Sequence, residues 1–313
     1  MDQVKGGFLG LAVGDAIGGP HEFRYSYPLN EYKGYIYLPI VYQRRFKPKE
    51  YSAIGQVTDD TSMAAALFNS ILDNKDWIED KVIQSYLDWA NSIVFLGKNT
   101  RALMKGVKTI KGYRTRYTKA DLSEVESNGS LMRLFPMVMI FWWNMEKVYE
   151  FARQDTLLTN PSPVNLEATR LYIWLLHNIV TKVTVRMEDV LRMVEISTIR
   201  EAVIQAFEGQ PRDVTVNKGW VVHAVYMFLQ AYVQSDRRSF REIMDWVILQ
   251  GGDTDTNGAI AGSVLGFIFG EIKMREDEIT NYNIEMVLNC DTSTGAFPME
   301  YKYHPKYIYD RLK

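Results

Sequence analysis

Residues 251–270, GGDTDTNGAIAGSVLGFIFG, carry the two features from which the rest of the chain can be interpreted. The first is a turn, opened by two glycines, in which Asp253 and Asp255 stand among threonine and asparagine side chains. Carboxylate and hydroxyl oxygens are the ligands that hard divalent cations prefer. Helix capping is the plainer interpretation, since Asp, Thr and Asn all cap helices. One cap needs one such residue, whereas five follow each other here, so the pattern favours a metal or ligand site.

The second feature is a glycine at every fourth position, at 258, 262, 266 and 270. The same spacing recurs near the N-terminus, at 6, 10, 14 and 18. Residues four apart lie on one face of a helix, and each glycine costs a helix interior about 0.8–1 kcal/mol relative to alanine. Small residues at this spacing let helix backbones approach in membranes. We therefore predict that these two helices cross closely.

Composition limits the class of protein. The 313 residues are 47% hydrophobic, enough for a sizeable core, and 36 basic against 38 acidic residues leave a formal charge of −2. Without a long like-charge run we expect no nucleic-acid partner. Cys290 is the only cysteine, which excludes a disulfide framework and fits a reducing compartment. Apolar runs fall short of the roughly 18 residues of a membrane span, so we expect a cytoplasmic protein with no membrane partner.

Apolar spacing close to 3.6 residues runs through most of the chain and predicts an all-α fold, one domain over residues 1–313 with ten or more helices. Loops are expected near 24–56 and over 111–126, and an irregular end is expected after residue 289. The predicted helices are 3–18, one following Thr58, 78–95, 99–111, one starting at Asn128, 144–158, 163–183, 187–208, 217–234, 238–250, one continuing from Asn257, and 276–289.

The segment 24–56 leaves two questions open. Three prolines break it, and its aromatic and β-branched residues fit either a short strand pair or an irregular loop. Seven tyrosines fall between Tyr25 and Tyr51. They suit a loop packed over the core, or a lid that adds an aromatic wall to a pocket.

A second acidic helix start stands at residues 58–61, TDDT. If it meets the turn at 253–255, the carboxylates of Asp59, Asp60, Asp253 and Asp255 share one pocket. Four neighbouring carboxylates do not all ionise unaided, and two divalent cations would balance their charge. With oxygen ligands and no nearby histidine, Mg²⁺ is favoured, then Mn²⁺, over zinc.

Four motifs in order resemble the ADP-ribosylglycohydrolases. They are GxxxGxAxGDAxGxPxEF at residues 6–23, TDDT at 58–61, NGSLMR at 128–133 and GGDTDTxGAIAGxxxG at 251–266. The resemblance implies an orthogonal bundle of α-helices and a centre of two Mg²⁺ ions. It implies metal ligands at Thr58, Asp59, Asp60, Asp253, Asp255 and Thr256, and substrate-binding residues at Asn128, Gly129 and Ser130.

The implied activity is metal-dependent hydrolysis of the N- or O-glycosidic bond between ADP-ribose and a protein side chain or small acceptor. Glu22 matches the family's acidic residue after the first helix and is the candidate general acid or base, with Asp255 second. For Asp15 we expect a structural role at the Gly252 turn. The alternative is a non-catalytic ADP-ribose-binding or structural relative, and the acceptor linkage stays open.

Three departures from the family pattern concern the substrate side and the C-terminus. Asn160 stands where the family often has histidine, in Thr-Asn-Pro at 159–161, and Ser127 stands where a glycine often precedes Asn-Gly. The usual Pro-Trp after the last glycine helix is missing. The six implied metal positions match the family pattern.

Overall fold

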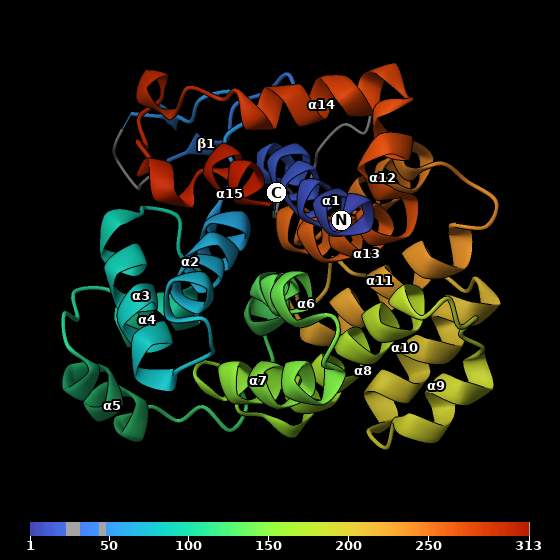
Figure 1. Ribbon diagram of the computed structural model, residues 1–313, viewed down its shortest axis with the longest axis horizontal. Coiled ribbons are helices and arrows are strands. Elements are labelled where there is room, and N and C mark those ends of the chain that lie inside the picture. The colour runs from blue at the N-terminus through green and yellow to red at the C-terminus, as the bar shows by residue number, and fades with distance from the viewer. Residues whose placement is uncertain (23–31, 44–47, 313) are drawn as a thin grey trace.

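Helices make up nearly all of the regular structure. The computed structural model describes residues 1–22, 32–43 and 48–312, and this part contains fifteen α-helices (Figure 1). They are α1 (Asp2–Gly18), α2 (Asp59–Asn74), α3 (Glu79–Ser92), α4 (Lys98–Met104), α5 (Ile110–Lys119), α6 (Phe135–Phe141), α7 (Met145–Leu157), α8 (Pro163–Val180), α9 (Met187–Met193), α10 (Ser197–Glu208), α11 (Val221–Gln234), α12 (Phe240–Leu249), α13 (Thr254–Arg275), α14 (Glu278–Leu288) and α15 (Pro305–Arg311). The all-α prediction is confirmed.

Shorter elements connect the helices. The short 3₁₀ helices are η1 (Gly19–His21), η3 (Asn128–Arg133), η4 (Thr292–Thr294) and η5 (Tyr301–Tyr303). Strands β1 (Val41–Tyr42) and β2 (Glu50–Tyr51) form one antiparallel pair. No helix within the described ranges combines the length and the apolar character that crossing a lipid bilayer requires.

The central pair is α1 and α13, which lie side by side in the middle of the molecule (Figure 1). A Cβ placed on Gly10 would stand 2.0 Å from the Gly262 carbonyl oxygen, and one on Gly14 would stand 2.0 Å from that of Gly258. Gly6 faces Gly266 in the same way. The predicted close approach is confirmed, but it is an antiparallel alignment along all of α1 rather than a local crossing.

Gly270 marks the far end of this pair. Its φ of 77° interrupts α13, and a Cβ there would stand 2.1 Å from the Asp2 carboxylate. Asp2 accepts a hydrogen bond from the Ile272 amide at 2.9 Å, so it caps the helical turn that restarts beyond the kink. The first residue of α1 therefore contacts α13 at its kink.

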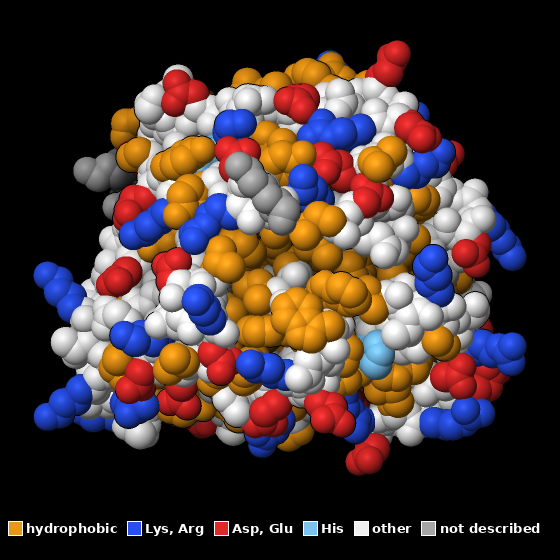
Figure 2. All heavy atoms as spheres, viewed as in Figure 1, with side chains coloured by type: hydrophobic (Ala, Val, Ile, Leu, Met, Phe, Trp, Pro, Cys, Tyr) orange, Lys and Arg blue, Asp and Glu red, His pale blue; other side chains and the backbone are white. Residues whose placement is uncertain are grey.

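The other helices surround the central pair. Helices α11 and α12 pack on α13, α14 and α15 pack on α1, and α2 packs on α3. Their buried apolar side chains form one contiguous core. Figure 2 shows apolar side chains gathered in the middle of one face, over α1 and α6, with charged side chains around them.

Several predicted boundaries are wrong. Helix α5 occupies most of the expected loop 111–126, because Thr109 caps it and Tyr113 anchors it to the Leu158 carbonyl. The single helix predicted over 187–208 is two, α9 and α10. Glu167 accepts the backbone N–H groups of Glu195 and Ile196 between them, so these amides bond to a distant helix instead of continuing α9. The C-terminal tail ends in α15 rather than remaining irregular.

The described part of segment 24–56 contains the short strand pair and a loop packed over the core. Asn283 of α14 accepts the Ile36 amide at 2.9 Å, and the Tyr32 hydroxyl donates to Asp245 of α12 at 2.7 Å. This favours the packed loop over the lid for residues 32–42. The tyrosines at 25 and 27 lie outside the described residues.

Candidate active site

The start of α2 is held by a buried carboxylate from α1. Asp15 accepts hydrogen bonds from the amides of Thr58 and Thr61, both at 2.9 Å, and from the Thr61 hydroxyl at 2.6 Å. The Thr58 hydroxyl lies 2.8 Å from the same carboxylate. Asp15 is fully buried. It supports this first turn, and not the Gly252 turn as expected. The turn orients Asp59 and Asp60, and Asp59 accepts the Gly97 amide at 2.9 Å.

The start of α13 is shaped by glycines and by its neighbours. Gly251 and Gly252 have φ of 75° and 77°, in the left-handed region that glycine adopts without strain. The Thr254 hydroxyl donates to the Gly18 carbonyl at 2.8 Å, which ties this turn to the end of α1. Asp253 accepts the Asn128 side-chain amide at 2.9 Å.

These two acidic helix starts converge, as predicted, and Glu22 joins them. Carboxylate oxygens of Glu22, Asp253 and Asp255 lie within 4.8 Å of one another. Asp59 and Asp60 lie close enough for the charge of Asp253 to raise their pKa values. The antiparallel α1–α13 pair produces this arrangement, because the end of α1 leads to Glu22 beside the first residues of α13.

Burial raises the pKa of every carboxyl group in this cluster, and the charges of neighbouring carboxylates raise it further for all of them except Asp253. Burial is the largest cause of the raised pKa of Glu22, followed by the charges of Asp253 and Asp59. The pKa of Asp255 is raised well above its usual value by burial and then by Glu22 and Asp60. Clustered carboxyl groups with raised pKa values are typical of sites that hold cations or transfer protons.

The donor set fits a hard cation. The Thr58 hydroxyl lies 2.8 Å from one oxygen of Asp15 and 2.8 Å from one of Asp60, and its single proton serves only one of them. The other oxygen of Asp60 is buried without a hydrogen-bond partner in the described structure. Thr256, whose amide donates to Asp255 at 2.9 Å, adds a hydroxyl oxygen at the same helix start. The six residues predicted as metal ligands therefore lie at two adjoining helix starts.

The loop 127–130 borders the cluster, and its three predicted substrate residues differ in orientation. Asn128 reaches Asp253 directly. Ser130 is fully buried, and its hydroxyl accepts a hydrogen bond from Asn165 at 3.0 Å, so its side chain supports the loop from inside. The Gly129 carbonyl accepts from the buried guanidinium of Arg133 at 3.0 Å.

Sequence reasoning missed the groups that hold this loop and the cluster from outside. A Cβ on Gly219 would stand 2.9 Å from the Asp253 carboxylate, so this glycine lets the α10–α11 connection close against the site. Asn165 bonds the Ser127 carbonyl. The fully buried ion pair between Arg133 and Asp155, 2.6 Å apart, supports the loop from the interior of the molecule. Of these residues, only Arg133 lies in one of the four sequence motifs, NGSLMR. Gly219, Asn165 and Asp155 lie in other segments of the chain, where no motif marks them.

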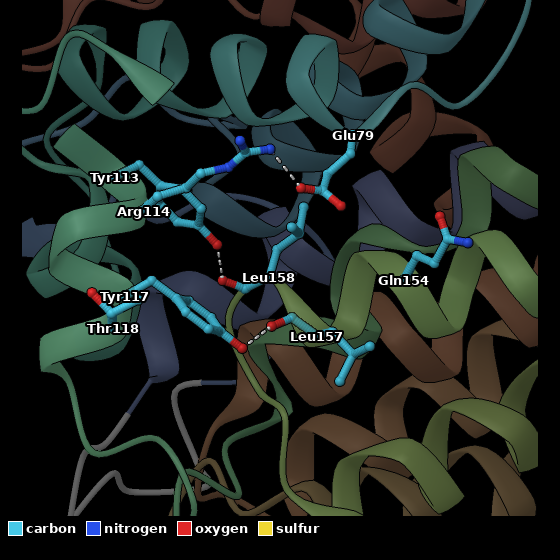
Figure 3. A pocket seen from close by; sticks show the side chains of 8 residues that line it. All are labelled: Glu79, Tyr113, Arg114, Tyr117, Thr118, Gln154, Leu157 and Leu158. Carbon is cyan, nitrogen blue, oxygen red and sulfur yellow. Dashed lines mark hydrogen bonds and ion pairs between the residues drawn. The ribbon is translucent and has the colours of Figure 1, made fainter. Parts of the chain in front are cut away.

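A separate pocket of about 340 Å³ lies between α3, α5 and α7. Figure 3 shows the hydroxyls of Tyr113 and Tyr117 directed at the carbonyls of Leu158 and Leu157. None of the predicted site residues lines this pocket. The two leucines that these tyrosines bond lead directly to Thr159 and Asn160.

Comparisons with known proteins identify the family of this chain. The sequence model of the family described as ADP-ribosylglycohydrolase matches residues 1–282. The chain is 26% identical to the ADP-ribosyl-[dinitrogen reductase] glycohydrolase of Rhodospirillum rubrum over 86% of each protein. It is 23% identical to an ADP-ribosylarginine hydrolase of Serratia proteamaculans, over 86% of this chain and 72% of that one. A solved structure described as an ADP-ribosylglycohydrolase-related protein complex superposes with a TM-score of 0.63 at 26% identity, over 90% of this chain and 96% of the other.

Proposed function

The chain belongs to the ADP-ribosylglycohydrolase family, and on this premise we propose that it hydrolyses the glycosidic bond between ADP-ribose and an acceptor. The acceptor is a protein side chain or a small conjugate. Relatives named for hydrolysis of ADP-ribosylarginine and of ADP-ribosylated dinitrogen reductase support this class of substrate. The observation that carries the proposal is the approach of the Glu22 carboxylate to Asp253 and Asp255 within 4.8 Å.

Glu22 is our candidate for the proton transfers of the reaction. A water oxygen forms a bond to the anomeric carbon of the distal ribose while the bond to the acceptor nitrogen or oxygen breaks, through an oxocarbenium-like state. The water loses a proton and the acceptor gains one. Glu22 is partly exposed, so it can exchange protons with solvent, and its pKa is raised well above the usual value by burial and by the charges of Asp253 and Asp59. Asp255 has the same character but is buried and is the second candidate.

We further propose that the cluster holds two Mg²⁺ ions, with Mn²⁺ as the alternative. Thr58, Asp59 and Asp60 would hold them from the start of α2. Asp253, Asp255 and Thr256 would hold them from the start of α13. When bound, such ions orient ribose hydroxyls and stabilise developing charge. The oxygen-only donor set and the unpartnered buried oxygen of Asp60 support this assignment.

The loop 127–130 would face the diphosphate and the distal ribose. Asn128 and the backbone at Gly129 are its members suited to direct contact, because Asn128 already reaches the cluster and Gly129 has no side chain to block a ligand. Ser130 would act through its buried bond to Asn165.

Turnover of defined conjugates tests the proposal. ADP-ribosylated arginine and serine peptides, with and without a chelator, should show metal-dependent release of free ADP-ribose. Glu22→Gln should lower kcat by about 10²-fold or more, while ADP-ribose still raises the melting temperature. Asp59→Ala with Asp255→Ala should abolish turnover and leave the helical circular dichroism spectrum near that of the wild type.

Two results would change the conclusion. Stabilisation by Mg²⁺ and by ADP-ribose without turnover of any conjugate would indicate the non-catalytic binding protein instead. Full activity in the Asp59→Ala and Asp255→Ala double variant would refute the assigned site.

A further inference from the structure

We propose that Asn160 is a positioning residue, which with Ser127 fixes the loop 127–130 so that Asn128 stays on Asp253 beside the substrate. This inference rests on the proposed function and adds to it a residue outside the acidic cluster. It starts from a chain of buried hydrogen bonds that ends at Asp253.

The orientation of the Asn160 amide is determined by its neighbours. The guanidinium of Arg133, which only donates, donates to the Thr159 hydroxyl at 2.9 Å. The hydroxyl proton of Thr159 is thereby available to the Asn160 carbonyl oxygen, at 2.7 Å. The Asn160 NH₂ group then faces Ser127, where it donates to the carbonyl at 3.1 Å and to the hydroxyl at 2.9 Å.

Side chains of α4 and α5 hold the backbone that precedes Asn160. Tyr117 and Tyr113 donate to the carbonyls of residues 157 and 158, as Figure 3 shows, and Asn99 donates to that of Thr159 at 2.6 Å. Three successive carbonyls are thus bonded by side chains of α4 and α5. Asn160 is only 1% exposed, and it therefore projects from a fixed support rather than from a free loop.

The other end of the chain of contacts reaches the acidic cluster. Asn128 follows Ser127 directly, its amide donates to the Gly219 carbonyl at 2.8 Å, and its side chain donates to Asp253 at 2.9 Å. Asn165 also bonds the Ser127 carbonyl, at 2.7 Å. Asn160 differs from Asn165 because it bonds the Ser127 hydroxyl in addition to the carbonyl. Losing it would let Ser127 rotate and would loosen the position of Asn128.

Asn160→Ala and Asn160→Asp test this role, with Asn178→Ala as the matched control. Asn178 is a partly buried asparagine of α8, and among the described residues its side chain bonds only its own helix, at the Trp174 carbonyl. The measurements are kcat and KM for an ADP-ribosylated peptide, the Kd of free ADP-ribose by calorimetry, and the melting temperature. We expect Asn160→Ala to raise KM and Kd together by about tenfold, the size expected for one or two lost hydrogen bonds, with kcat changed less.

Asn160→Asp should be worse than alanine, because its carboxylate oxygen would face the Ser127 carbonyl at hydrogen-bonding distance. Ser127→Ala should raise Kd by about threefold on its own. In the Asn160→Ala background it should add almost nothing, because the two residues act through each other. The control should bind like the wild type.

A lowered melting temperature with wild-type KM and Kd in Asn160→Ala would show a purely structural role and overturn the inference. Additive effects of the two alanine substitutions would do the same. If Asn160→Ala does not fold, Ser127→Ala alone decides through its Kd. A wild type that neither binds ADP-ribose nor releases it refutes the proposed function too. An active wild type with an unaltered Asn160→Ala variant refutes only the positioning role.

Discussion

Replacement of Gly10 by alanine tests the central packing of the fold. The new Cβ would stand 2.0 Å from the Gly262 carbonyl oxygen and 2.8 Å from its carbonyl carbon. Real Cβ contacts essentially never fall below 3.0 Å, and both atoms belong to the backbone of α13, so no side-chain rotation relieves the contact. The helices must separate until that 2.0 Å distance exceeds 3.0 Å.

The cost follows from opposing effects. Overpacking of a close-packed interior costs typically about 1–3 kcal/mol, and occasionally more. Alanine recovers about 0.8–1 kcal/mol of helix propensity over glycine. Because two rigid helices must move apart along their shared length, we expect the upper part of the range for overpacking, which leaves a net loss of about 2 kcal/mol in the free energy of unfolding. That corresponds to a melting temperature about 4–8 °C lower.

Thermal and urea unfolding of the purified variant measure this loss. Gly112→Ala in α5 is the control, because its Cβ would meet only side-chain atoms of Val107 and Thr109, at 3.1 and 3.2 Å. We expect it to change stability by less than about 1 kcal/mol. Combining Gly10→Ala with Gly262→Ala should cost less than the sum of the two, because one separation relieves both contacts. A Gly10→Ala variant as stable as the control, or strict additivity, would refute this reasoning.

Three further predictions concern buried charge. Asp60→Asn should stabilise the chelator-treated protein and reduce the stabilisation by added Mg²⁺, since burial and neighbouring carboxylates raise the pKa of Asp60 well above its usual value; an unchanged melting response to Mg²⁺ would contradict this. Burial also raises the pKa of Asp15 from 3.8 to about 6. In the chelated protein this group should therefore lower the free energy of unfolding by up to about 3 kcal/mol between pH 4 and pH 6, because the unfolded state releases its proton at lower pH than the folded state does. Urea unfolding at both pH values measures it, and Asp15→Asn should flatten the dependence. Arg133→Met leaves the buried charge of Asp155 unpaired and should lower the free energy of unfolding by about 3–5 kcal/mol. The double variant Arg133→Met with Asp155→Leu should lose less, because it removes both charges. Equal stability of the single and double variants would argue against the ion pair.

The site was predictable where a motif carries its own chemistry. Asp59 and Asp253 stand in recognisable acidic helix starts, and a shared pocket was predicted on the condition that these two starts meet. Other contacts had no local signal. The residues next to Ser130 in the sequence do not show that its hydroxyl bonds Asn165 in the interior. Likewise, the residues next to Asp15 do not show that it bonds the first turn of α2. Backbone groups such as the Gly97 amide carry no residue signature at all.

Helix boundaries failed for a related reason. Periodicity identifies the apolar face of a helix but does not show which distant group will bond an exposed amide at its end. Glu167 ends α9 by accepting two amides, although it lies in α8. Thr109 and Tyr113 hold α5 together although its own residues are largely polar.

The sequence by itself determined the all-α class, the two glycine-striped helices and the two acidic helix starts, because spacing and side-chain chemistry are local properties. Only the tertiary structure decided that α1 and α13 run antiparallel, since a glycine at every fourth residue is equally compatible with either direction. That direction brings Glu22 to Asp253 and Asp255. It also decides which carboxyl groups are buried together, and therefore their pKa values, because desolvation and charge depend on neighbours far away along the chain.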